Sequence, residues 1–127
     1  MAVVGATLID ILELVGGFQR AGGMVLAGTD CPNVAIVSGF SLHRELELLV
    51  RAGLSPMEAI VAATRRPAER LGKSDVFGTI APGRAADLLL LAADPLADIR
   101  NIRRIERVIV GGIVYEPGKL LEGLRPG

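Results

Sequence analysis

The feature that most constrains the fold is a short apolar run, Met24 to Ala27, which leads directly into Gly-Thr-Asp. Four consecutive apolar residues predict a strand that is buried on both faces and needs neighbouring strands and covering layers. In α/β sheets of this kind, functional residues collect just beyond the carboxyl ends of the strands. Asp30 lies at that position, so its carboxylate needs a basic side chain, a helix N-terminus or a metal ion as a partner.

The segment before this strand predicts a helix. Apolar residues recur at helical spacing from Leu8 to Phe18, and Thr7 with Asp10 can form a capping box. The glycine pair Gly16-Gly17 weakens the helix, and the pair Gly22-Gly23 ends it.

Further helices are predicted after Asp30. Ser41 is the expected N-cap of one helix, which Gly53 ends. The sequence Ser-Pro-Met-Glu from Ser55 is typical of a helix start, and this helix is expected to run to about Arg65. It must stop before Pro67, which can open one more short helix that ends at a glycine, Gly72.

The C-terminal part predicts strands instead. Phe77 to Ile80 and Asp87 to Leu91 are expected to be strands joined by a Pro-Gly turn, followed by a polar linking segment. Two β-branched runs flank Gly111-Gly112, which predicts a hairpin with a two-residue turn. We therefore expect an α/β to α+β fold, divided into a helix–strand–helix segment, 1–72, and a β segment, 73–127.

Composition excludes several classes of protein. Fourteen Lys and Arg residues balance 14 Asp and Glu residues among 127, so net charge favours neither nucleic acid nor an anionic membrane as a partner. The apolar stretch Leu88 to Ala93 is too short to span a bilayer. Cys31 is the single cysteine, so an intrachain disulfide is excluded and a reducing, cytoplasmic location is expected.

Four motifs carry a family resemblance: AGTDCPN, AGLSPMEA, GTIAPGRAADL and VIVGGIVY. In this order the chain resembles, over roughly Val25 to Glu116, the C-terminal end of a metal-dependent amidohydrolase of the imidazolonepropionase and prolidase-like branch. The resemblance implies the last portion of a (β/α)₈ barrel beside strands of a small β-sandwich. It also implies that Asp30 ends the eighth barrel strand, binds a divalent metal, with zinc expected, and serves as catalytic general base to the metal-bound water.

Most of the family's metal ligands have no counterpart in this sequence. Members carry His-x-His after the first strand, usually Lys or Glu after the fourth, and single histidines after the fifth and sixth. This sequence has one histidine, His43, and it follows Asp30. Because a metal that activates water needs about three protein ligands, we expect an incomplete barrel that holds no metal alone.

Three functions are compatible with these observations. The chain is a fragment or truncated homologue of a hydrolase that cleaves non-peptide or dipeptide C–N bonds and is inactive alone, a non-catalytic self-associating protein, or one subunit of a split hydrolase. The partners expected are other copies of the chain, or a separate chain carrying the missing barrel strands. No nucleic acid or membrane partner is expected.

The remaining candidate residues also have ordinary structural interpretations. His43 is either a polar surface or capping residue or borders the pocket mouth. Cys31 is interpreted as a small loop residue, with adventitious metal or intermolecular disulfide chemistry as the alternative. The arginines at 65, 66 and 70 are expected to form a solvated helix end, and Asp87 to be structural.

Overall fold

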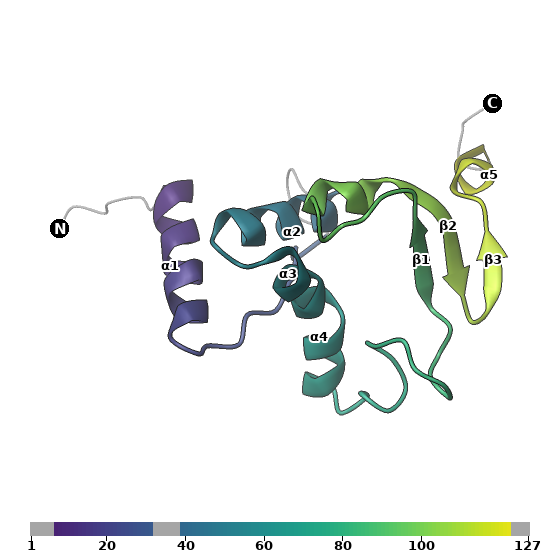
Figure 1. The fold of residues 1–127 in the computed structure, drawn as a ribbon, viewed down its shortest axis with the longest axis horizontal. Helices are drawn as coiled ribbons and strands as arrows, with labels where there is room; N and C mark the ends of the chain where they lie inside the picture. The colour runs from purple at the N-terminus through teal and green to yellow at the C-terminus, as the bar shows by residue number, and fades with distance from the viewer. Residues whose placement is uncertain (1–6, 32–38, 123–127) are drawn as a thin grey trace.

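The computed structural model describes residues 7–31 and 39–122. Figure 1 shows α1 to α4 on one side of the molecule and a three-stranded sheet on the other. Within the described ranges, no helix is long and apolar enough to cross a membrane. The elements in chain order are α1 (Leu8–Arg20), α2 (Ser41–Arg51), α3 (Pro56–Ala63), α4 (Arg65–Arg70), β1 (Leu88–Leu91), the 3₁₀ helix η1 (Ile99–Arg103), β2 (Ile105–Val110), β3 (Ile113–Tyr115) and α5 (Pro117–Glu122).

Helix α1 begins and ends where the sequence predicts. The Thr7 hydroxyl accepts a hydrogen bond from the amide of Asp10, and the Asp10 carboxylate accepts one from the amide of Thr7. This capping box satisfies amides that the first helical turn leaves without partners. After Arg20 the chain leaves the helix, and Gly22 takes a φ of +85°.

Helix α1 lies against the end of α2 through a buried glycine. A Cβ atom at Gly16 would overlap the backbone carbonyl oxygen of Ala52, whereas Gly17 faces only the far end of the Arg20 side chain. Gly16 therefore does more than weaken the helix, because its missing side chain allows the two backbones to approach closely.

The start of α2 corrects one prediction. Ser41 is the first residue of the helix and not its N-cap, a position that Phe40 occupies without a side-chain hydrogen bond to the helix. Phe40 already has helical backbone angles, φ −88° and ψ −34°. An N-cap residue normally has an extended backbone and a side chain that accepts a hydrogen bond from the first turn, and Phe40 has neither. The cap predicted at Ser41 therefore does not form.

Helices α3 and α4 follow the predicted order with shifted boundaries. Ser55 and Glu58 form the predicted capping box, and α3 ends at Ala63, slightly earlier than expected. Helix α4 begins two residues before Pro67 rather than at it. Proline fits there because amides in the first helical turn have no partner within the helix.

Residues 23–30 belong to no helix or strand, so the predicted strand does not form. Within the part of the chain that the structure describes, no other strand pairs with Met24 to Ala27. Val25 and Ala27 pack against the core, whereas Met24 and Leu26 are each 42% exposed. A strand requires a ladder of hydrogen bonds to a neighbouring strand, and the described residues place no strand beside this segment.

The C-terminal sheet is antiparallel with the order β1-β2-β3. The predicted hairpin is confirmed: Val110 pairs with Ile113 across a turn in which Gly111 and Gly112 have φ values of +56° and +83°. The carboxylate of Asp87 accepts a hydrogen bond from the Gly111 amide at 2.7 Å, which supports its structural interpretation. The described residues contain this one sheet, so the β-sandwich remains a prediction.

The predicted strand from Phe77 to Ile80 is wrong. These residues form turns and bends, and the only ladder-like contact across the Pro-Gly turn is the hydrogen bond from the Ala85 amide to the Val76 carbonyl oxygen. Gly78 has a φ of +96° and lies tightly against Ala68 of α4. A positive φ at this position breaks the extended conformation that a strand needs.

The hydrophobic core lies where α2, α3 and η1 meet. The segment expected to be a polar linker contains η1, whose Ile99 and Ile102 are only 6% and 7% exposed. Residues three apart share one face of a 3₁₀ helix, so both isoleucines enter the core and that prediction is corrected. The cluster contains residues from both sides of the boundary predicted between residues 72 and 73. The division of the chain into two segments there stays a prediction. The buried members of the cluster are Leu46, Leu49, Ala52, Leu54, Ala59, Ala62, Ile99 and Ile102.

The hairpin turn leads to a testable prediction. Replacing Gly112 with valine is expected to lower the free energy of unfolding by more than about 1 kcal/mol, because a β-branched residue resists positive φ. Denaturant unfolding followed by circular dichroism measures the change. Gly111→Asn is the matched control, since asparagine tolerates the left-handed conformation. An unchanged midpoint for the valine variant would contradict this turn geometry.

Candidate functional site

The helices hold the segment that leads to Asp30. The Ala27 amide donates a hydrogen bond to the carbonyl oxygen of Ala62 at 2.9 Å. The Val25 carbonyl oxygen accepts one from Nη1 of Arg66 at 3.1 Å. Ala62 lies near the end of α3 and Arg66 lies in the first turn of α4, so these two helices fix the course of the chain a few residues before Asp30.

Asp30 itself has an unusual backbone conformation. Among the described residues it is the one non-glycine residue with positive φ, at +51°, and it is exposed. Aspartate is one of the few side chains that tolerate the left-handed region, and residues held there often lie at functional sites. The structure therefore presents the Asp30 carboxylate outward, at the end of a segment whose backbone is anchored.

The other two candidates, Cys31 and His43, are both half-buried. Cys31 follows Asp30 directly, and His43 lies in the first turn of α2. Burial lowers the pKa of His43, and the nearby positive charge of Arg103 lowers it further, while Glu47 opposes both effects. A histidine in this environment is favoured in its neutral form.

These residues alone do not fit a metal ion. Within residues 7–31 and 39–122, no group of three or more His, Cys, Asp or Glu side chains lies close enough to hold one. Asp30 offers a single exposed carboxylate, and activation of water by a metal takes about three protein ligands. Any metal bound at Asp30 would need ligands beyond those that the described residues bring together.

A second group of polar residues was missed by reasoning from the sequence. Nη1 of Arg66 donates not only to Val25 but also to Oε1 of Gln19, at 3.3 Å. Nε2 of Gln19 in turn donates to Oε1 of Glu58 at 3.2 Å. Arg66 is half-buried, so its interpretation as part of a solvated helix end is wrong. No local pattern reveals this role, because its partners lie about 40 residues away in the sequence.

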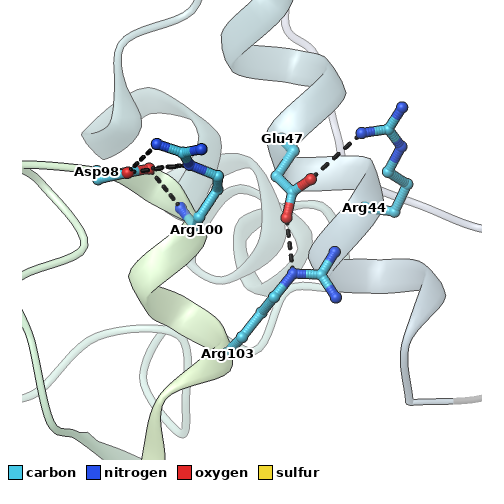
Figure 2. A network of polar contacts seen from close by, with 5 residues as sticks. All are labelled: Arg44, Glu47, Asp98, Arg100 and Arg103. Carbon is cyan, nitrogen blue, oxygen red and sulfur yellow. Dashed lines mark hydrogen bonds and ion pairs between the residues drawn. The ribbon is translucent and has the colours of Figure 1, made fainter.

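A network of ion pairs joins α2 to η1 (Figure 2). Glu47 binds Nε of Arg103 at 2.7 Å and Nη1 of Arg44 at 3.3 Å. The hydrogen bond from Arg103 is the main reason why the pKa of Glu47 lies below its usual range. On η1 itself, the Asp98 carboxylate accepts hydrogen bonds from the Arg100 guanidinium. The network fixes the β segment to the helices near His43.

The arrangement of these elements matches a known family. The model of the amidohydrolase family matches residues 9–114, which is most of the chain. The chain belongs to this family. The resemblance to the amidohydrolases that the GTD, AGLSPMEA, GTIAPG and GG motifs indicated is thereby confirmed. The described helices and antiparallel sheet form part of an amidohydrolase fold.

Individual amidohydrolases match only through a part of their length. An adenine deaminase of Deinococcus deserti is 40% identical over 86 residues, which make up 68% of this chain and 14% of that protein. An imidazolonepropionase of Geobacillus kaustophilus is 32% identical over 105 residues, or 79% of this chain and 24% of that protein. The crystal structure of a putative prolidase from Bifidobacterium longum superposes with a TM-score of 0.75 and 39% identity, over 83% of this chain and 26% of that one. The chain therefore spans about a quarter or less of the length of these amidohydrolases.

Proposed function

We propose that the chain is the C-terminal part of a metal-dependent hydrolase that cleaves non-peptide or dipeptide C–N bonds, and that it is inactive by itself. The observation that carries this proposal is the position of Asp30. The residue follows the anchored segment 23–28, is exposed, and is held in a left-handed conformation. It also falls on the aspartate of the GTD motif through which the chain resembles its family.

The proposed role of Asp30 follows from its chemistry. A carboxylate oxygen can bind a divalent ion or accept a proton from a water molecule that attacks a substrate. The described residues supply no further ligands beside it. We therefore assign the other ligands to the remaining barrel, and we derive no catalytic step from this chain alone. The match to the amidohydrolase family, whose relatives include an adenine deaminase and an imidazolonepropionase, supports a hydrolase but no particular substrate.

The isolated chain is expected to bind no stoichiometric divalent ion, because Asp30 has no partner ligands among the described residues. Elemental analysis after dialysis against zinc measures this. Asp30→Asn should leave both metal content and stability nearly unchanged, since the carboxylate is exposed. About one tightly held zinc per chain would overturn the prediction, because a structural or catalytic site retains its metal under these conditions.

A chimera tests the function itself. The matching C-terminal region of a solved relative, such as the Xaa-Pro dipeptidase that superposes with a TM-score of 0.76, is replaced by this chain. Hydrolysis of the relative's dipeptide substrate is then measured. Asp30→Asn is expected to lower kcat by about 10² or more, as loss of a general base does. Glu106→Gln, at an exposed position of β2, is the control and should leave activity unchanged. An Asp30→Asn chimera with full activity would reject the proposal.

A further inference from the structure

We infer that Arg66 is a positioning residue for Asp30, acting through the backbone of the segment 23–28. This inference rests on the proposed function of Asp30. Arg66 makes no contact that would let it act on a substrate, but it binds the chain that delivers Asp30.

The anchor is built from specific, partly buried contacts. A single guanidinium nitrogen, Nη1 of Arg66, donates one hydrogen to the Val25 carbonyl oxygen and the other to Oε1 of Gln19. The Gln19 amide is oriented so that its oxygen faces the arginine and its NH₂ group faces Glu58. The opposite orientation would place the NH₂ group beside the donors of Arg66 and the amide oxygen beside the carboxylate of Glu58. The network therefore favours one orientation of the Gln19 amide.

Glu58 links this network to the start of α3. Its Oε2 accepts hydrogen bonds from the amide and hydroxyl of Ser55, and its Oε1 accepts from Gln19. Gln19 of α1 therefore connects the capping box of α3 on one side to Arg66, in the first turn of α4, on the other. The hydrogen bond to Gln19 restrains the guanidinium nitrogen that binds Val25, so the anchor depends on α1 as well as on α4.

Two hydrogen bonds hold the backbone of the segment at points two residues apart. Arg66 binds the carbonyl of Val25 and Ala62 binds the amide of Ala27. Two fixed points restrain the course of the backbone, and Asp30 follows three residues after the second of them.

The neighbouring arginines do not share this role. Arg65 is 53% exposed and forms an ion pair with Glu69 within α4, and Arg70 is exposed at the end of the helix. Only the arginine that faces the core side of α4 reaches the segment. Lysine at this position also carries more than one N–H donor, but its flexible ammonium lacks the planar guanidinium that fixes the directions of those donors.

Amide hydrogen exchange followed by NMR tests the anchor in the full chain. Arg66→Ala is expected to speed exchange of the Ala27 amide about tenfold, the factor that corresponds to loss of one hydrogen bond, while the Leu49 amide in α2 changes little. Arg65→Ala is the matched control and should change neither amide. Arg66→Lys should restore part of the protection. Equal acceleration at Ala27 and Leu49, or none at Ala27, would overturn the inference.

The chimera separates failure of this inference from failure of the proposed function. Arg66→Ala should lower kcat about tenfold with little change in KM, and Gln19→Leu, which removes only the support of the guanidinium, should lower kcat less. If Asp30→Asn is inactive while both variants keep full kcat, the positioning role fails and the proposed function stands. If Asp30→Asn keeps full activity, the proposed function fails, and the positioning role for Asp30 fails with it.

Discussion

Replacing Gly16 with alanine is expected to lower the free energy of unfolding by about 2 kcal/mol, although alanine is the better helix former by about 1 kcal/mol. The new Cβ would overlap the carbonyl oxygen of Ala52, which is backbone and cannot turn aside as a side chain can. Helix α1 would have to move away from the end of α2. Leu12 and Val15, which pack against the core from α1, would lose part of their contact.

Gly17 provides the control for this effect in the same helix. A Cβ atom there meets only the Arg20 side chain, at 4.0 Å. Gly17→Ala is therefore expected to raise the free energy of unfolding by up to about 1 kcal/mol. Thermal and denaturant unfolding of both variants would show shifts of opposite sign. Two shifts in the stabilising direction would mean that α1 does not lie against Ala52.

The isolated chain is expected to form a dimer or a larger closed oligomer at micromolar concentration. We propose a second copy of the chain as the partner, because the structure leaves large apolar side chains uncovered. In the segment before Asp30, Leu26 is 42% exposed, and in α1 Leu14 is 72% exposed. At the edge strand β3, Val114 is 59% exposed. Covering these side chains would stabilise the association by about 25 cal/mol for each Å² of apolar area removed from water.

Open backbone edges add to this tendency. Among residues 7–31 and 39–122, strands β1 and β3 each have one edge with no neighbouring strand, and such edges pair readily with another chain. Two-fold association, with or without exchange of a segment, is the commonest way to cover them. Among the described residues, no hydrogen bond reaches the backbone of Met24 or Leu26, so the segment before Asp30 offers a further edge.

Light scattering of the purified chain measures its mass, and two variants locate the contact. Leu26→Lys changes the segment before Asp30, and Val114→Lys changes β3. The variant that raises the monomer fraction identifies the contact surface. Leu71→Lys is the control, because Leu71 is 68% exposed at the end of α4 and belongs neither to the segment before Asp30 nor to β3. A monomer mass for the unmodified chain would contradict the prediction.

The sequence predicted much of the candidate site but not its support. Asp30 stood out because a carboxylate directly follows an apolar run, and the family resemblance gave that position a role. The side chain that anchors the run, Arg66, is one of several arginines near the end of a helix, and neither neighbouring residues nor helical periodicity distinguishes it. Its partners Gln19 and Val25 come from a different part of the chain, so their proximity is a property of the fold.

The sequence by itself determined the features whose energies are local. The capping boxes at Thr7 and Ser55 and the glycine turn of the hairpin each depend on a few adjacent residues, and each formed as predicted. The tertiary structure decided the features that need a distant partner. Met24 to Ala27 has strand-like composition, yet it makes no ladder because no strand of the described part of the chain lies beside it. Ile99 and Ile102 lie in a segment of polar character, yet they are buried because η1 packs against α2. Local hydrogen bonds form wherever the residues allow them, whereas burial and strand pairing depend on which surfaces the whole chain brings together.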